Sequence, residues 1–400
     1  MGALLESPAG ELGLDVGRKQ EAWGVEALQR GVCPLIVPTR PEDLASHYDL
    51  TISHPAVDQP SLAAFERWLA EATARRGLSC AVLHDGVVHE AVRRLEDGRL
   101  TIYFHLDYFA MWHISGDPYA RLVQAVQDTG GRPINPPARS RLFTDKAAAH
   151  AELVRHGLGV PETVVFRPGA PDRPLTEAER RRLRLQEPGA RVYLKPANGF
   201  AQRGVVRVDN TDPASLTTAV AAARLYDRND ALLLQREVRC PQLTCDDGTA
   251  RPAYWRVLHC LGDVIPFWWN KAEGEQGRPS YRWVSAAENE RHGLGPVLEF
   301  AEALADLSGL DWFSTEVCLS EGPERSRYTV RGMNGDGRRW PVVAIDYVND
   351  QCDMHVQSRW PGGPPDDVVR YVAERFAGAA ALEAKKSTLP GGPLPLRAAA

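Results

Sequence analysis

A change of pattern near residue 138 is the feature that most constrains the fold. Before it, short apolar segments typical of buried strands alternate with segments whose apolar residues recur at helical spacing. The expected strands are 33–38, 78–86 and 100–109, and the expected helices are 62–77 and 119–131. Strands that alternate with helices are typical of an α/β layer. We therefore expect a small α/β domain up to the proline-marked joint INPPARS at 134–140.

After the joint, strands and hairpins outnumber helices. Helices are expected within 142–166 and at 176–186, 213–226 and 295–309, and strands at 190–195, 205–210, 231–238, 312–320 and 341–349. The segment 254–271 has the pattern of a β-hairpin, with Gly262 and Asp263 as its turn. This second part of the chain therefore predicts α+β architecture rather than a continued α/β layer.

The length supports more than one lobe, because a chain of 400 residues is too long for one compact core. We expect an N-terminal α/β domain at 1–138, a small lobe at 139–235 and a C-terminal lobe at 236–385. The Pro/Gly-rich end, 386–400, is expected to be a disordered tail.

Composition excludes several classes of protein. The net charge of −5 gives no reason to expect nucleic acid, and the basic run at 180–184 is typical of a solvated helix face. The seven cysteines form no C-x-x-C pair, so neither a zinc site nor a disulfide framework is indicated, and a reducing cytoplasm fits best. No signal peptide and no segment of membrane-spanning length is apparent.

Basic and glycine residues point to phosphate chemistry. Lys146 starts a predicted helix just after Thr144 and Asp145, which resemble cap and first-turn residues, and Lys195 closes a predicted strand. The loop that follows, 196–204, contains Gly199 and Gly204. Lysines supply point charges for phosphate oxygens, and glycines let backbone N–H groups approach them. Each feature alone is more often a surface lysine or an ordinary loop, so the hypothesis depends on their order.

Polar residues on later strands complete the pattern. Alternation puts Gln235 and Glu237 on one face of their strand, where they suit an adenine amino group or ribose hydroxyls. Glu316 and Asp346 stand in apolar strands, and Asn349 follows three residues after Asp346. Carboxylate and amide oxygens are ligands that Mg²⁺ prefers. Arg256 is the candidate for steadying a transferring phosphoryl group.

In the order of these motifs the chain resembles the ATP-grasp superfamily. The resemblance covers roughly 134–377, with its best stretches TDKAAAHAELVRHGLGVPET, VYLKPANGFAQRGVVRV, LLLQREV, and STEVCL with VAIDYVND. It implies an N-terminal α/β pre-ATP-grasp domain followed by two α+β lobes that clamp ATP. It also implies that Lys146 and Lys195 contact the phosphates and the adenine side.

The resemblance further implies that Gln235 and Glu237 lie in the linker that reads adenine, and that Glu316, Asp346 and Asn349 bind magnesium. Two departures from the family pattern stay open. The usual last motif is Glu-x-Asn, whereas this chain has one extra residue, so either Asn349 or Asp350 completes the metal set. The linker reads Gln-x-Glu, and either residue is a candidate for the ribose.

Most relatives phosphorylate a carboxylate and let an amine attack the acyl phosphate. The sequence therefore predicts an ATP-dependent C–N ligase with Mg²⁺, acting on a small carboxylate and an amine, such as an amino acid or peptide. An ATP-grasp kinase that phosphorylates a hydroxyl group is the alternative, and a non-catalytic nucleotide-binding protein is a third hypothesis. A homodimer is left open, and neither a nucleic-acid nor a membrane partner is expected.

The sequence does not identify the substrate, but it offers candidate residues for binding one. Candidate carboxylate binders are Arg203, Arg256, Lys271, Arg278 and Arg282, most of which must be surface charges. Trp268 and Trp269 either line an apolar pocket or cover the core. The aromatic segment containing His105, Asp107 and His113 is interpreted as a packed strand and turn, with a contribution to the acceptor pocket as the alternative.

Overall fold

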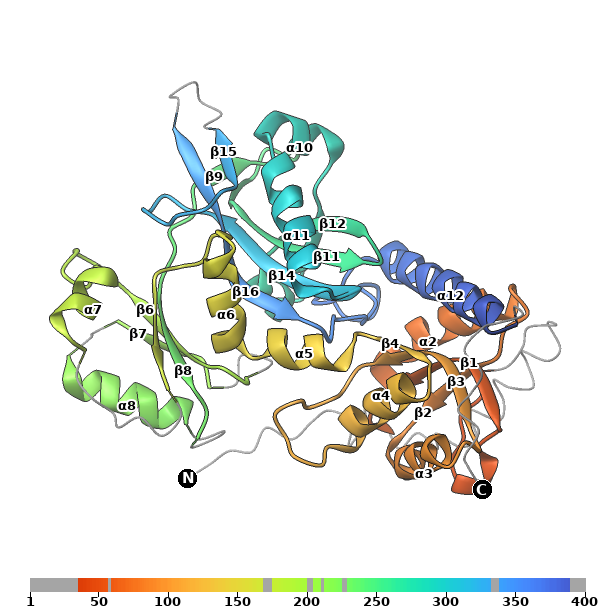
Figure 1. Ribbon diagram of the computed structural model, residues 1–400. Coiled ribbons are helices and arrows are strands. Elements are labelled where there is room, and N and C mark those ends of the chain that lie inside the picture. The colour runs from red at the N-terminus through yellow and green to blue at the C-terminus, as the bar shows by residue number, and fades with distance from the viewer. Residues whose placement is uncertain are drawn as a thin grey trace.

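The computed structural model describes residues 35–56, 59–167, 175–199, 204–209, 212–224, 229–331 and 338–388. Residues 1–34, most of the predicted tail and Arg203 lie outside these ranges. Within them the chain builds three larger β-sheets and one two-stranded hairpin, each larger sheet with helices of its own (Figure 1).

The N-terminal layer is a four-stranded parallel sheet in the order β2-β1-β3-β4. A short 3₁₀ helix, Pro41–Asp43, precedes it. Its elements are β1 (His47–Ser53), α2 (Gln59–Ala74), β2 (Cys80–Leu83), α3 (Asp85–Glu96), β3 (Thr101–Asp107), α4 (Pro118–Asp128) and β4 (Arg132–Ile134). Because neighbouring side chains of a strand point to opposite faces, Val82 of β2 packs toward α2 and Leu83 toward α3 and α4.

Two helices lead away from this layer, α5 (Pro137–Thr144) and α6 (Lys146–Arg155). The small lobe that follows is an antiparallel sheet in the order β5-β8-β6-β7. Its elements are β5 (Thr163–Phe166), α7 (Glu177–Arg182), β6 (Val192–Pro196), β7 (Val206–Val208), α8 (Pro213–Ala223) and β8 (Leu232–Arg236). The apolar faces of its strands and of α8 form a separate core.

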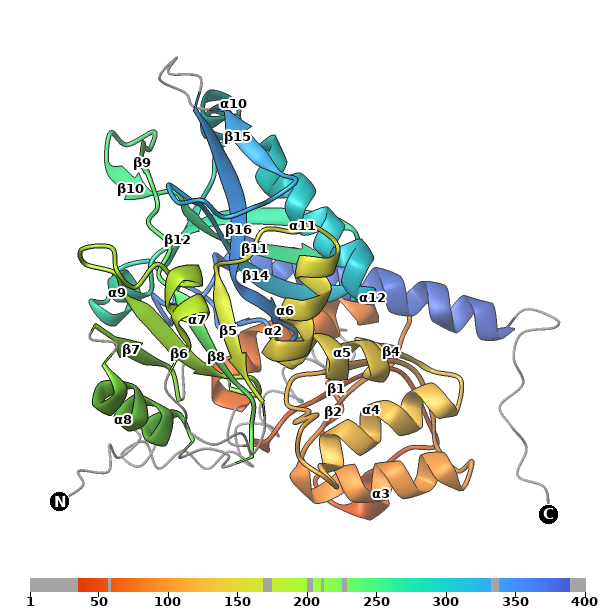
Figure 2. The same cartoon turned by 60° about the vertical axis from the view of Figure 1, so that its left-hand side comes forward.

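The third sheet has six antiparallel strands in the order β13-β12-β11-β14-β16-β15. Its elements, with the adjoining hairpin and helices, are β9 (Gln242–Thr244), β10 (Ala250–Pro252), β11 (Tyr254–Cys260), β12 (Asp263–Trp269), α9 (Lys271–Glu275), β13 (Tyr281–Trp283), α10 (Ala286–His292), α11 (Gly295–Ser308), β14 (Trp312–Leu319), β15 (Thr329–Arg331) and β16 (Arg339–Asn349). Helices α6 and α11 bury their apolar residues against one face of it. Helix α6 lies between the two antiparallel sheets (Figure 2).

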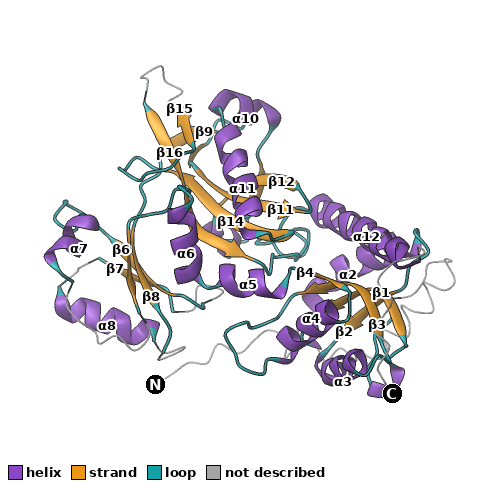
Figure 3. Cartoon of the chain, viewed as in Figure 1, coloured by secondary structure: helices purple, strands orange, loops and turns teal. Residues whose placement is uncertain are grey.

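The last helix, α12 (Asp366–Thr388), returns to the N-terminal layer, where it packs on α2 and the sheet face beneath it (Figure 3). Phe376 of α12 lies against Phe104 of β3 and Trp312 of β14, at ring-centroid distances of 6.4 and 5.4 Å. One apolar core therefore joins the N-terminal sheet, α12 and the six-stranded sheet.

The predicted fold class, an α/β domain followed by α+β lobes, is confirmed, while several local predictions were wrong. The strand predicted at 33–38 is, in its described part, an isolated bridge between Ile36 and Ala81. The hairpin turn lies at Leu261 and Gly262, both with positive φ, one residue before the predicted turn. The tail predicted from 386 begins inside α12, which continues to Thr388.

Candidate active site

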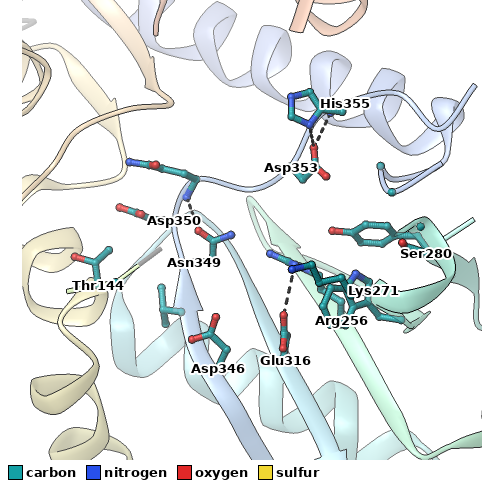
Figure 4. Close-up of a pocket in the computed structure, with 18 of the residues that line it drawn as sticks. Thr144, Arg256, Lys271, Ser280, Glu316, Asp346, Asn349, Asp350, Asp353 and His355 are labelled. Atoms are coloured by element: carbon teal, nitrogen blue, oxygen red, sulfur yellow. Dashed lines mark hydrogen bonds and ion pairs between the residues drawn. The ribbon is translucent and has the colours of Figure 1, made fainter. Parts of the chain in front are cut away.

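A cleft of about 570 Å³ lies where the three parts of the chain meet. Its walls come from the turn after β3, the start of α6, the loop after β6, the exposed face of the six-stranded sheet and the segment after β16 (Figure 4). Six of the predicted site residues line it: Lys146, Gly199, Arg256, Glu316, Asp346 and Asn349.

Lys146 is the first residue of α6, and the side chain of Asp145 caps this helix by accepting bonds from the N–H groups of residues 147 and 148. Its Nζ donates to the carbonyl oxygen of Gly199 over 2.6 Å and lies 4.0 Å from an oxygen of Asp346. The ammonium group therefore lies between the loop after β6 and the carboxylates of the cleft.

Lys195 lies on β6, just outside the lining of the cleft. Its Nζ donates to the Gln235 side-chain oxygen at 2.7 Å and to the carbonyl oxygen of Ile345 at 3.1 Å. Burial lowers the pKa of this ammonium group, while the nearby Asp346 and Glu316 carboxylates act in the opposite direction. The side chain thus links the small lobe to β16.

Gln235 and Glu237 have different partners in the structure. Gln235 is buried, and besides accepting from Lys195 it donates to the Tyr347 hydroxyl at 3.1 Å. Glu237 follows the end of β8 and accepts from the Tyr193 hydroxyl at 3.2 Å. Neither residue lines the cleft.

The carboxylates Glu316 and Asp346 are direct cross-strand partners on β14 and β16. Next along the two strands, Ser314 pairs with Asn349, so two residues on β14 oppose three on β16. Such a bulge shifts the alternation of side chains by one position. Asn349 consequently lies on the same face as Asp346, although it is three positions further along the sequence.

Asp350, the alternative to Asn349, also lines the cleft but has its own partner. Its carboxylate accepts from the indole N–H of Trp112 at 3.3 Å, and burial raises its pKa to about 6. In the described ranges no three His, Cys, Asp or Glu side chains gather closely enough to hold a metal ion. The oxygen donors Glu316, Asp346 and Asn349 fit a hard cation that takes its remaining ligands from phosphates and water.

Arg256 lies beside these carboxylates. It contacts Glu316 at 3.5 Å and donates to the Ser314 hydroxyl at 3.1 Å, while its guanidinium stacks over Trp269 at 5.4 Å from the ring centroid. Tyr254, which the sequence interpretation did not single out, donates to the other oxygen of Glu316. Burial raises the pKa of Glu316, and the guanidinium opposes that shift.

The two predicted glycines differ in their surroundings. Gly199 lines the cleft and offers its carbonyl to Lys146. Gly204 has a φ of +74°, and a Cβ there would lie 3.0 Å from Pro196. Glycine at 204 is thus explained by the backbone. Residues 200–203 of the same loop lie outside the described ranges.

The candidate substrate residues are divided between two places. Lys271 and Trp269 line the cleft, whereas Arg278 and Arg282 line a second pocket beside β13. Arg282 pairs with Asp247 and Glu288 at 3.0 Å each. Trp268 is buried, which supports the alternative that it covers the core.

Part of the aromatic segment at the end of β3 is packed into the structure, and part of it lines the cleft. His105 is buried between Thr51 and Ser53, and burial lowers its pKa to about 3. Asp107 is buried as well and accepts from the N–H of Ala110 at 2.8 Å. These two residues are structural, whereas His113 beyond them lines the cleft.

The sequence interpretation missed one wall of the cleft. Asp353, His355 and Trp360, on the segment between β16 and α12, all line it. Their only signal in the sequence is that they follow Asn349 closely, which is not specific.

Solved structures with a similar fold were found by comparison. A D-alanine–D-alanine ligase from Bacillus anthracis, solved in complex with ATP, aligns over 86% of this chain and 100% of its own, with a TM-score of 0.53 and 11% identity. A RimK domain ATP-grasp protein from Sphaerobacter thermophilus aligns over 82% of this chain and 98% of its own, with a TM-score of 0.50 and 17% identity.

The chain has the ATP-grasp fold. The resemblance inferred from the motifs is therefore confirmed at the level of the fold. No protein-family model matches this ATP-grasp chain. Among the described helices, none is long and apolar enough to cross a membrane.

Two sequence relatives of this ATP-grasp chain are both named D-alanine–D-alanine ligase. A D-alanine–D-alanine ligase of Mycobacterium sp. (strain KMS) is 38% identical over 107 residues, and the match spans 26% of this chain and 26% of that relative. Another, from Mycobacterium avium (strain 104), is 28% identical over 321 residues, which cover 72% of this chain and 79% of the relative.

Proposed function

We propose that this ATP-grasp chain is an ATP- and magnesium-dependent carboxylate–amine ligase that joins amino acids or small peptides through an acyl phosphate. One observation carries the proposal, namely that Lys146, Arg256 and the oxygen donors Glu316, Asp346 and Asn349 line a single cleft. The names of the sequence relatives, all D-alanine–D-alanine ligases, support amino acids as the substrate class.

In the proposed reaction Lys146 and Lys195 bind the phosphates of ATP. Lys146 has to exchange its bond to the Gly199 carbonyl, or share it, and its helix-start position keeps the ammonium group at the cleft. Lys195 is already partly desolvated, so its charge acts on a phosphate oxygen with little screening by water.

Glu316, Asp346 and Asn349 would hold magnesium, which neutralises the charge that develops on the transferring phosphoryl group. Arg256 is oriented by Ser314 and Glu316 and by stacking on Trp269, so it presents a fixed cation to the same place. The substrate carboxylate would enter beside Arg256, in line with the γ-phosphate.

An acyl phosphate hydrolyses, so the cleft has to exclude water while the second substrate attacks. Closure of the small lobe over the six-stranded sheet would supply that exclusion. Cytoplasmic location and a homodimer stay predictions.

The experiment is a phosphate-release screen with ATP, Mg²⁺ and a pool of D- and L-amino acids, followed by mass analysis. A ligase should release ADP slowly until a suitable amine is present. Its product should weigh the sum of acid and amine less one water. Hydroxylamine added in place of the amine should give a hydroxamate.

The same screen tests the kinase alternative. A kinase would yield a phosphorylated hydroxyl substrate, with neither amide nor hydroxamate. That outcome would replace the ligase proposal.

A further inference from the structure

The segment between β16 and α12 presents alternate side chains to the cleft. Three of its residues are buried in the core around α12: Cys352, Met354 and Val356. The residues interleaved with them all line the cleft: Gln351, Asp353 and His355. Burying every second residue turns the others to the opposite side, so Asp353 and His355 are directed into the cleft by the backbone.

The same segment is held in place by its own contacts. The side-chain amide of Gln357 donates to the carbonyl oxygens of Tyr281 and Gly363 at 3.0 and 3.2 Å. Gly363 lies so close to His355 that a Cβ there would come within 1.8 Å of the His355 carbonyl oxygen. The backbone on either side of His355 is therefore packed rather than loose.

Asp353 and His355 form a carboxylate–imidazole pair. One carboxylate oxygen of Asp353 lies 2.6 Å from Nδ1 of His355 and also accepts from the His355 backbone N–H at 2.9 Å. A carboxylate at Nδ1 holds the neutral ring in the tautomer with its proton on Nδ1, which makes Nε2 the basic nitrogen. Figure 4 shows this pair across the open space from Arg256 and Glu316, with the Asp353 carboxylate nearer to them than the His355 ring.

The other carboxylates that line the cleft lie beside donors or cations. Glu316 is held by Arg256 and Tyr254 and Asp350 by Trp112, while Glu275 lies 3.6 Å from Lys271 and Asp346 lies 4.0 Å from Lys146. An amino-acid acceptor reaches the cleft as an ammonium ion, which cannot attack a carbonyl carbon until it loses a proton. The ligase reaction therefore needs a base on the acceptor side of the acyl phosphate.

We propose that His355, oriented by Asp353, is the general base that deprotonates the acceptor amine. Nε2 of His355 takes one proton from the ammonium group. The freed electron pair on nitrogen attacks the acyl-phosphate carbonyl carbon, the C–N bond forms and the C–O bond to phosphate breaks. The second nitrogen proton leaves with inorganic phosphate. This inference rests on the proposed ligase function.

The test compares two nucleophiles with the same enzyme. Hydroxylamine is largely uncharged at neutral pH and needs no base, so it reports acyl-phosphate formation alone. With ATP, Mg²⁺ and the amino-acid pool, His355→Gln should lower dipeptide formation by about a hundredfold, the usual contribution of a general base. Hydroxamate formation by the same variant should be little changed, which also shows that the variant is folded.

Asp353→Asn should lower dipeptide formation as well, because the ring loses its orienting charge. The matched control is His47→Gln. His47 pairs with Asp49 two residues away at 3.1 Å and is exposed to 42%, against 39% for His355, but it lies at the start of β1. This control should keep both activities.

The outcomes separate the two proposals. Equal loss of dipeptide and hydroxamate in His355→Gln, or no loss of dipeptide, would overturn the role of His355 and leave the ligase function standing. Absence of hydroxamate from the unchanged enzyme would overturn the ligase function and the inference together.

Discussion

At the scale of single residues, the charged groups of the candidate site differ in burial, from Asp346, whose side chain is 37% exposed, to Lys195, which is enclosed and held by specific partners. Lys195 has lost much of its hydration and is compensated by Gln235 and the carbonyl of Ile345. Gln235 in turn donates to Tyr347. An unpaired buried ammonium would be costly, so these partners explain how the charge is tolerated at this position.

We expect Lys195→Ala to weaken ATP binding by about 1–3 kcal/mol, the range for a hydrogen bond to a charged group. Titration calorimetry with Mg·ATP measures the change, and Lys146→Ala should add to it. Lys386→Ala on the exposed side of α12 is the control. Unchanged ATP affinity in the double variant would show that the two lysines do not bind phosphate.

Asp107 predicts a dependence of stability on pH. Burial raises its pKa from 3.8 to about 7, so between these values the folded state keeps a proton that the unfolded state has lost. The contribution of Asp107 to stability therefore falls as pH rises from about 4 to about 7. Asp107→Asn should lack this dependence while keeping an acceptor for the Ala110 N–H.

Urea unfolding of both proteins across this pH range measures the difference in free energy of unfolding. The parent protein should lose stability relative to Asp107→Asn toward pH 7. A difference that stays constant with pH would contradict the assignment of the proton to Asp107.

At the scale of elements, the bulge between β14 and β16 is what places Asn349. Without it, alternation would turn a residue three positions after Asp346 to the opposite face of the sheet. The cross-strand pairs Glu316–Asp346 and Ser314–Asn349 take up the extra residue. The bulge therefore favours Asn349 over Asp350 as the third oxygen donor.

We expect Asn349→Ala to raise the Mg²⁺ concentration needed for half-maximal turnover by about tenfold, as for one lost ligand interaction of about 1.4 kcal/mol. Asp350→Ala should leave this concentration nearly unchanged. Magnesium titrations of turnover at saturating ATP make the comparison. The reverse pattern would assign the site to Asp350.

Elements differed in how well the sequence predicted them. The hairpin and helix of the C-terminal lobe follow clear patterns, and the start of α6 was predicted from Thr144 and Asp145 as cap and first-turn residues, of which Asp145 is the cap. β1 was missed because buried parallel strands usually read as apolar runs, whereas this strand carries Thr51 and Ser53 in its interior.

Long-range contacts limited the prediction of the site. The order of the lysines and acids along the chain indicated a shared cleft, but nothing local showed that Lys195 bonds to Gln235. The wall formed by Asp353 and His355 depends on packing of the intervening residues against α12, a contact between distant parts of the chain. Sequence periodicity reports the face of an element and not its partner.

At the scale of the whole molecule, α12 holds the cleft together. It packs against the N-terminal sheet on one side and, through Trp312 and Phe267, against the six-stranded sheet. The turn after β3 and the segment after β16 both line the cleft and are hydrogen-bonded to each other, Trp112 to Asp350 and Gln351 to Ala110, so both are tied to the same core.

Phe376→Ala should lower the free energy of unfolding by about 3–5 kcal/mol, because it leaves a cavity between Phe104 and Trp312. Chemical denaturation measures this loss. Tyr371→Ala, at a more exposed position on the same helix, should cost far less. Similar effects of the two changes would argue against α12 as the central support.

The central claim is that ATP activates a carboxylate before the amine attacks. Its most direct test labels the carboxylate oxygens of the amino-acid pool with ¹⁸O and follows the label by mass spectrometry. An acyl phosphate passes one substrate oxygen to the phosphate when the C–O bond breaks, so each amide formed should be matched by one phosphate carrying a single ¹⁸O. Unlabelled phosphate, or a phosphorylated hydroxyl group with both carboxylate oxygens still in place, would contradict the ligase account.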